Sequence, residues 1–195
     1  MLLDFGGVIA EEGYRFGLEA IAGRNDVDPA DLKREADDAI YDTGYITGRG
    51  TESGFWERLR RRTGIAGSDD ALSGEILRRF VLRPRMIAAV RELRRQGVVV
   101  GILSDQTDWL ERLDARDRFF PEFDRVFNSF RLGKGKRDAT VFDDVVRDLG
   151  AVPGEALFVD DNPGHVDRAR SRGLAAILFR TEDAFFKELS AWTAS

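Results

Sequence analysis

Short apolar runs bounded by turn residues recur towards the two ends of the chain. After the opening "MLLD" come "VVVGILSD", "RVFNS", "ALFVDD" and "LAAILF". Runs of this kind are typical of strands buried in a parallel sheet. The segments between the later runs have helical periodicity and clear ends, as in "PRMIAAVRELRRQG", where Pro84 stands in the first turn and Gly97 follows the last. This alternation predicts an α/β fold with a doubly wound parallel sheet.

The stretch from residue 14 to residue 83 follows a different pattern. It contains the capped helical patterns "DPADLKREADDAI", "TESGFWERLRRRTG" and "SDDALSGEILRRF", preceded by an earlier one, and no strand pattern lies between them. We therefore predict a helical insertion, or cap, over residues 14–83. The α/β core is expected to comprise residues 1–13 and 84–195.

Two expectations concern the ends of the chain. The first strand of such a sheet should be central, yet only "MLL" precedes Asp4, where a buried strand commonly has about five or six residues. We expect the natural protein to start upstream of Met1. At the other end, "TEDAFFKELSAW" is expected to form a helix that packs on the sheet through four side chains. These are Phe185, Phe186, Leu189 and Trp192.

Composition argues against several classes of protein. The formal net charge is −5 over 195 residues and both signs are interspersed, so neither nucleic acid nor a membrane surface is an expected partner. No apolar run approaches the roughly 18 residues of a membrane span, and the opening residues lack an export signal, which favours a cytoplasmic protein. The chain has no cysteine and one histidine, His165. Any metal is therefore expected on oxygen ligands.

Polar residues follow three of the predicted strands at the point where each strand ends. They are Asp4, Ser104, Asp105, Asp160 and Asp161. The carboxyl ends of parallel strands meet at one edge of the sheet, which is where ligands bind in this fold class. Carboxylates that converge there repel one another unless a hard cation neutralises them, and such oxygen ligation suits Mg²⁺. The hydroxyl of Ser104 and the ammonium of Lys136, in the loop before a helix, together suit a phosphate.

Four segments resemble the motifs of a known superfamily in order and spacing: "LLDFGGVIA", "GILSDQT", "RLGKGKRDATVF" and "LFVDDNPGHVDRARSRGL". The superfamily is that of the haloacid dehalogenases (HAD), most of which are metal-dependent phosphatases with a related α/β core. The insertion resembles its α-helical cap, and "YDTGYITGRGTESGFWERL" is similar to a cap stretch of the glucose-1-phosphatase-like and epoxide-hydrolase-phosphatase-like branch.

The resemblance implies roles for individual residues. Asp4 would be the catalytic nucleophile. Ser104 and Lys136 would act with it by holding the phosphoryl group. The remaining implied positions fall into two sets. The metal ligands would be Asp4, the carbonyl of Gly6, Asp160 and Asp161, and the substrate-binding residues would be Gly7, Ser104, Asp105 and Lys136.

Several positions differ from the usual pattern of that superfamily. Asp105 stands where relatives commonly have Asn, and its extra charge could weaken phosphate binding unless it faces the metal or a donor. Arg137 stands where Pro is frequent and is expected to be solvated. His165 is expected to be a local hydrogen-bonding residue rather than a general base. Of the acidic pair, Asp161 is expected to ligate the metal directly and Asp160 to support it.

Gly6 is the most consequential difference. Most phosphatases of this superfamily carry an aspartate here, which protonates the leaving alcohol and then activates water. Three accounts remain open at this stage: a phosphatase with a substitute acid, a metal-independent dehalogenase that attacks carbon, or a catalytically weakened phosphate-binding protein. The adjacent acidic pair at residues 160 and 161 favours the phosphatase, because such a pair beside Asp4 would be electrostatically costly without a cation.

The sequence thus predicts a Mg²⁺-dependent phosphatase acting on a small phosphorylated metabolite, such as a sugar phosphate, through an aspartyl phosphate. Without a built-in acid, it should favour substrates whose leaving group needs little protonation. Specificity is expected to come from cap residues near Tyr41, Tyr45 and Trp56, although Trp56 also fits core packing of the cap. We expect a monomer or a weak homodimer.

Overall fold

The computed structural model describes residues 1–193. In this part of the chain one five-stranded sheet forms in the order β3-β2-β1-β4-β5, and every neighbouring pair is parallel. The strands are β1 (Leu2–Leu3), β2 (Gly101–Ser104), β3 (Arg125–Asn128), β4 (Leu157–Asp160) and β5 (Ala175–Leu178). Each corresponds to one of the apolar runs. The predicted doubly wound α/β fold is therefore confirmed, with β1 at its centre.

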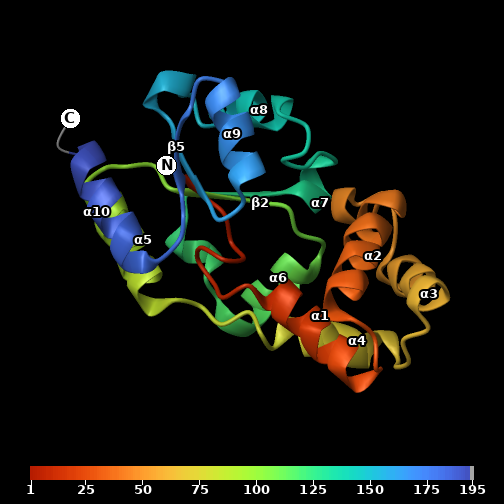
Figure 1. The fold of residues 1–195 in the computed structure, drawn as a ribbon. Coiled ribbons are helices and arrows are strands. Elements are labelled where there is room, and N and C mark those ends of the chain that lie inside the picture. Colours follow the sequence, from red (N-terminus) through yellow and green to blue (C-terminus); the bar gives the residue numbers. More distant parts are fainter. Residues whose placement is uncertain (194–195) are drawn as a thin grey trace.

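Helices cover both faces of the sheet (Figure 1). They are α5 (Pro84–Arg95), α6 (Trp109–Asp117), α7 (Ser129–Leu132), α8 (Thr140–Asp148), α9 (Pro163–Ser171) and α10 (Glu182–Thr193), with the 3-10 turns η2 (Phe120–Glu122) and η3 (Pro153–Glu155). Successive strand residues point to opposite faces. Leu3 thus packs in the cluster that includes α5, α6 and α10, whereas Leu2 packs with α8 and α9. None of the helices described is long and apolar enough to cross a membrane.

The last helix differs in part from its prediction. Phe185 and Leu189 of α10 are buried in the core, and Phe186 is half-buried under the guanidinium of Arg85. Trp192, however, is 36% exposed, and the two residues before it are exposed as well. The expectation that Trp192 packs on the sheet is wrong, because the last turn of α10 faces solvent.

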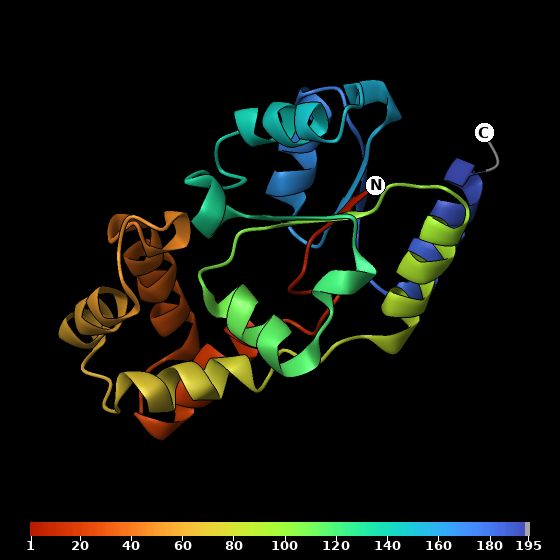
Figure 2. The ribbon, with the colours of Figure 1, turned by 180° about the vertical axis from the view of Figure 1, so that it is seen from behind.

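Between β1 and α5 the chain forms helices only. These are α1 (Gly13–Arg24), α2 (Pro29–Asp42), η1 (Tyr45–Thr47), α3 (Glu52–Thr63) and α4 (Asp69–Leu77). The side chains of Asp28, Thr51 and Ser68 cap α2, α3 and α4, respectively. Each accepts a hydrogen bond from a backbone N–H group in the first turn of its helix. The chain leaves and re-enters the core side by side, where Ala10 pairs with Leu82. Figure 2 shows this cap beside the α7 end of the sheet.

Hydrogen bonds between side chains fix the cap against α6. Glu52 Oε1, in α3, accepts hydrogen bonds from Trp109 Nε1 at 2.7 Å and from Arg112 Nη1 at 2.9 Å. The hydroxyl of Tyr45 donates to Asp108, which immediately precedes α6. Tyr45 is buried against aromatic rings at this joint. Its position therefore serves the attachment of the cap.

Candidate active site

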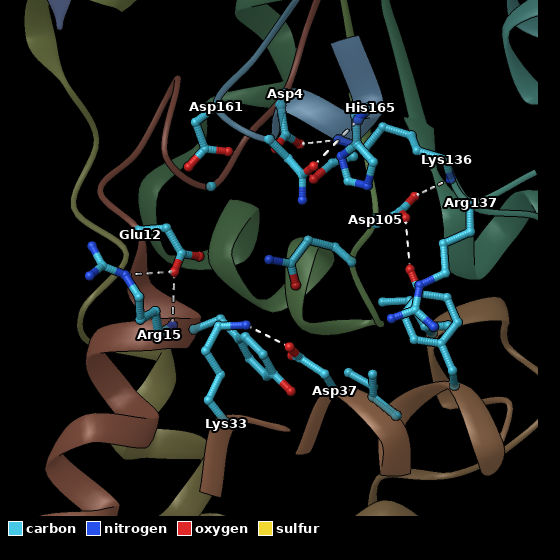
Figure 3. A pocket seen from close by; sticks show the side chains of 18 of the residues that line it. Asp4, Glu12, Arg15, Lys33, Asp37, Asp105, Lys136, Arg137, Asp161 and His165 are labelled. Carbon is cyan, nitrogen blue, oxygen red and sulfur yellow. Dashed lines mark hydrogen bonds and ion pairs between the residues drawn. The ribbon is translucent and has the colours of Figure 1, made fainter. Parts of the chain in front are cut away.

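Three carboxylates meet at the carboxyl end of the sheet. Figure 3 shows two of them, Asp4 and Asp161. The register of the central strands pairs Leu3 with Val159, so Asp4 leaves β1 beside the point where Asp160 and Asp161 end β4. One oxygen from each of the three carboxylates lies within 4.8 Å of those of the other two. The convergence expected from the strand endings is therefore present.

A buried ammonium group lies between two of these carboxylates. Lys136 comes from the loop before α8, and its side chain is 1% exposed. Its Nζ lies 2.9 Å from Asp4 Oδ1 and 2.6 Å from Asp160 Oδ2. Burial alone would lower the pKa of Lys136, but the charges of Asp160 and Asp4 outweigh it and raise the pKa, so the group stays an ammonium.

Asp160 is saturated by bonds to the protein. Besides Lys136, its oxygens receive the backbone N–H of Asn162 at 2.7 Å and face Nδ1 of His165 at 3.2 and 3.3 Å. Burial would raise the pKa of Asp160, but Lys136 and His165 outweigh it and lower the pKa to about 2. Asp161, in contrast, lines the cavity and is exposed. This geometry favours Asp161 as a direct metal ligand and Asp160 as its support.

The pKa of Asp4 is shifted in the opposite direction from that of Asp160. Burial raises its pKa to about 8 despite the adjacent Lys136, and the charges of Asp160 and Asp161 add to the increase. Its Oδ1 lies near the ammonium but has no hydrogen-bond partner among the described residues. A cluster of oxygen donors that cannot all be ionised together without an added cation fits Mg²⁺.

Gly7 makes room for Asp161. Its φ is +81°, and a Cβ built on it would lie 2.2 Å from Asp161 Oδ2. The left-handed backbone and the lack of space both require glycine. Gly7 was predicted to bind substrate, but it is buried outside the cavity wall, and its carbonyl accepts a hydrogen bond from Arg83 Nη1 at 2.7 Å. Gly7 therefore leaves room for the Asp161 carboxylate and does not line the cavity.

Gly6 opens a space that another carboxylate faces. It lines the cavity, and a Cβ built on it would lie 3.7 Å from Oε1 of Glu12 and 3.2 Å from Phe80 Cε1. Glu12 precedes α1, and its Oε2 accepts the backbone N–H of Arg15 at 3.1 Å. Burial raises the pKa of Glu12, and the charge of Asp161 raises it further. A carboxyl group with a raised pKa therefore lies beside the position where the usual aspartate is missing.

Ser104 and Asp105 end β2 on the other side of Asp4. Ser104 is buried and lines the cavity, as a phosphoryl ligand would. The Asp105 carboxylate accepts the backbone N–H of Lys136 at 2.8 Å and the hydroxyl of Tyr41 at 3.0 Å. These donors offset the negative charge that stands where relatives have Asn. Asp105 thereby links the core to the cap.

The carboxylates open into a cavity of about 500 Å³ between core and cap. Of the three aromatic residues expected to set specificity, only Tyr41 lines it. The prediction for Tyr45 is wrong, because its ring and hydroxyl are used at the joint with α6. Trp56 is fully buried in the cap and donates from Nε1 to Ser73 at 2.8 Å, so the core-packing alternative holds for it.

Several cavity residues were not predicted from the sequence. Glu12, Tyr14, Arg15 and Lys33 line it from the cap side, together with Asp37. Helical periodicity gives no signal for them, since they occupy polar positions of α1 and α2 or their approaches. Arg137 also lines the cavity, with its guanidinium 3.4 Å above the ring centre of Tyr41. It was expected to be solvated, and it is exposed but stacked.

Residues 2–171 match the protein family described as haloacid dehalogenase-like hydrolase. The chain belongs to this family. The match includes all the converging strand ends and the whole cap, so the expected superfamily membership is confirmed, while the specific branch stays a prediction.

Similar proteins are consistent with this membership. The pig bifunctional epoxide hydrolase 2 is 30% identical over 115 residues, which span 55% of this chain but only 20% of that protein. A HAD family enzyme from Bacteroides thetaiotaomicron, in complex with magnesium and inorganic phosphate, has a TM-score of 0.71 at 20% identity and 93% coverage of both chains. An L-2-haloacid dehalogenase from Xanthobacter autotrophicus, with covalently bound chloropropionic acid, has a TM-score of 0.66 at 19% identity, covering 100% of this chain and 83% of that one.

Substitution of the two adjacent glycines should have unequal effects. We expect Gly7→Ala to destabilise the fold by at least about 1–2 kcal/mol, the usual cost of a left-handed non-glycine residue, and to push Asp161 out of place. Gly6→Ala, whose φ lies outside the left-handed region, requires only a small shift of Phe80 and should cost less. Chemical unfolding with and without Mg²⁺ measures both effects. If both variants lost the same stability and the same Mg²⁺-dependent stabilisation, the role of Gly7 in making room for Asp161 would be contradicted.

Binding of Mg²⁺ should strengthen as the pH rises. Since the pKa of Asp4 is raised to about 8 in the metal-free protein, Mg²⁺ must displace a proton, and its affinity should rise by roughly tenfold per pH unit between pH 5 and 7. Titration calorimetry in two buffers of different ionisation enthalpy measures both the affinity and the proton release. Asp4→Asn should abolish most of the pH dependence. An affinity that is constant from pH 5 to 8 would contradict the assignment.

Proposed function

We propose that this protein is a Mg²⁺-dependent hydrolase of small phosphomonoesters. The observation that carries the proposal is the Asp4 carboxylate, which lies in contact with a buried ammonium and within a cluster of carboxylates that fits a divalent cation. A nucleophile between a cation site and an ammonium suits an electrophile that carries negative charge, as a phosphoryl group does. The magnesium and phosphate bound by a structural neighbour support this choice.

Hydrolysis would proceed in two displacements at phosphorus. An oxygen of Asp4 attacks phosphorus and forms an aspartyl phosphate, while the bond to the leaving oxygen breaks and that oxygen takes up a proton. A water molecule then attacks the same phosphorus, loses a proton and releases phosphate, which restores the Asp4 carboxylate. The Lys136 ammonium and the Ser104 hydroxyl hold the phosphoryl oxygens through both steps.

The residues placed to hold Mg²⁺ are Asp4, Asp161 and the carbonyl of Gly6, with Asp160 supporting them. When bound, the cation would neutralise charge that develops on the phosphoryl oxygens. Asp160, whose pKa is held low, keeps the Lys136 ammonium in place by a 2.6 Å contact. Gly7 leaves room for the Asp161 carboxylate at the site, because a Cβ on Gly7 would lie 2.2 Å from Asp161 Oδ2.

A metal-independent dehalogenase is less well supported. Halide leaves carbon without protonation and without a cation, so a dehalogenase gains nothing from the acidic pair beside Asp4. The raised pKa of Asp4 in the metal-free protein would leave much of the nucleophile protonated at neutral pH. The phosphatase proposal accounts for both features, because Mg²⁺ would ionise Asp4.

The substrate is proposed to be a small phosphorylated metabolite, such as a sugar phosphate. The protein is proposed to be located in the cytoplasm.

Glu12 is proposed as the substitute general acid and base. Its Oε1 faces the space that a side chain on residue 6 would fill, and its raised pKa keeps more of the carboxyl protonated near neutral pH. It would donate a proton to the leaving oxygen in the first step and accept one from water in the second. Its own protonation is therefore restored after each turnover.

Loss of the nucleophile should abolish turnover without loss of the fold. Asp4→Asn removes a negative charge and little volume, and we expect phosphate release from a panel of phosphomonoesters to fall below detection. Asp167→Asn is the matched control, because it makes the same change at an exposed residue. It should retain wild-type rates. Colorimetric phosphate assays with Mg²⁺ and with chelator measure both requirements. Full activity in chelator, or turnover by Asp4→Asn, would refute the proposed mechanism.

Moving the carboxylate should test the role of Glu12. Glu12→Gln is expected to lower kcat/KM by about 10²-fold or more for alkyl phosphates and less for aryl phosphates, whose leaving groups need little protonation. In that background Gly6→Asp should restore part of the loss, if Phe80 yields to the new Cβ. Glu57→Gln is the control, because Glu57 is exposed on α3 and pairs with Arg61 away from the cavity.

A rate loss independent of leaving-group pKa would argue against acid catalysis by Glu12. The comparison uses kcat/KM because this constant includes the first displacement and excludes hydrolysis of the aspartyl phosphate. If hydrolysis of the intermediate limits kcat, a pre-steady-state burst of alcohol should precede phosphate release. The burst phase therefore separates the role of Glu12 as an acid in the first displacement from its role as a base in the second.

A further inference from the structure

The cationic side chains that line the cavity differ in their partners. Lys136 contacts Asp4 and Asp160, and Lys33 lies 2.5 Å from Asp37. Arg15 pairs with Glu12 and with Glu19. Arg137 forms no ion pair and donates no hydrogen bond to any residue in the described part of the chain. Among the cationic side chains of the described residues that line the cavity, Arg137 is thus the one with no carboxylate partner.

Arg137 is nevertheless held in a defined orientation. Its guanidinium carbon lies 3.4 Å above the centre of the Tyr41 ring, and Tyr41 is fixed in turn by donating to Asp105 at 3.0 Å. Figure 3 shows the Arg137 side chain extending past Asp105 towards the cap, away from Asp4. Stacking covers one face of a guanidinium and leaves the N–H groups at its edge free to donate. The result is a preorganised fork for an oxyanion.

The guanidinium of Arg137 lies away from the position proposed for the phosphoryl group. That group is proposed to bind beside Asp4, Ser104 and Lys136, at the strand ends, whereas Arg137 extends towards the cap. The cavity of about 500 Å³ leaves room for the remainder of a substrate between the two points. The Tyr14 hydroxyl is a second polar group available to a substrate. Its oxygen is buried in the same cavity wall and has no hydrogen bond to any described residue.

We propose that Arg137 binds a second oxyanion of the substrate, so that the preferred substrates are phosphomonoesters that also carry a carboxylate or a second phosphate. This inference rests on the proposed phosphatase function and narrows its substrate class. Arg137 acts in binding and touches no reacting atom. Its loss should therefore raise KM more than it lowers kcat.

Binding to an inactive variant tests the inference without turnover. In Asp4→Asn with Mg²⁺, calorimetry compares 3-phosphoglycerate with glycerol 3-phosphate, and fructose 1,6-bisphosphate with fructose 6-phosphate. The first pair isolates a carboxylate and the second a further phosphate. We expect at least one of the two compounds with a second anionic group to bind about tenfold more tightly than its counterpart without that group, as a charge-assisted hydrogen bond allows.

Adding Arg137→Gln should reduce that preference about tenfold or more, and Arg137→Lys should reduce it less. Lys134→Gln is the matched control, because Lys134 lies in the same loop but pairs with Asp144 outside the cavity. The inference is overturned if neither compound with a second anionic group binds more tightly than its counterpart, or if Arg137→Gln and Lys134→Gln change the affinity ratios equally. Absence of phosphate release by the wild-type protein would instead refute the proposed function, and the binding ratios would still decide the role of Arg137.

Discussion

The buried ammonium of Lys136 is the interaction on which the site depends. An isolated ammonium in the core would cost several kcal/mol in lost hydration, and carboxylates brought together at one sheet edge would repel one another. The contacts of 2.9 Å with Asp4 and 2.6 Å with Asp160 offset both costs at once. One cation cannot balance three carboxylates, however, and the raised pKa of Asp4 expresses the remaining imbalance. The electrostatics of the protein alone thus leave a deficit of positive charge at Asp4.

The two glycines after Asp4 solve different steric problems. Gly7 allows Asp161 to approach the first loop, and its left-handed φ turns the chain towards the cap. Gly6 has an ordinary φ, so its role lies in the side chain that it lacks. The space beside it is faced by Glu12, at the start of α1. A carboxyl group from the residue that precedes α1 thus lies beside the position that a side chain of residue 6 would occupy.

The sequence was sufficient for what depends on local pattern. Apolar runs gave the strands, capping residues gave the starts of α2, α3 and α4, and the acidic strand ends gave the cluster around Asp4. The contributions of the cap were not predictable in the same way. Tyr41 and Tyr45 stand four residues apart near one helix end, yet one faces the cavity and the other the joint with α6. That difference is set by how the cap docks on the core, which no local pattern encodes. The exposure of Trp192 is likewise a tertiary property.

The docking of the cap also sets which of its side chains face the acidic strand ends across the cavity. Glu52 and Tyr45 bond to α6 and its approach, and Tyr41 bonds to Asp105. These contacts hold polar side chains of both signs of charge, from α1 and α2, opposite the acidic strand ends. Tyr41 joins the two halves, because its hydroxyl contacts Asp105 of the core while its ring supports the guanidinium of Arg137. Asp105, which in relatives is commonly Asn, therefore accepts a strong donor from the cap in addition to the Lys136 backbone. A neutral amide there would weaken the hydrogen bond from Tyr41 and loosen the surface on which Arg137 rests, so the two departures at residues 105 and 137 are parts of one arrangement.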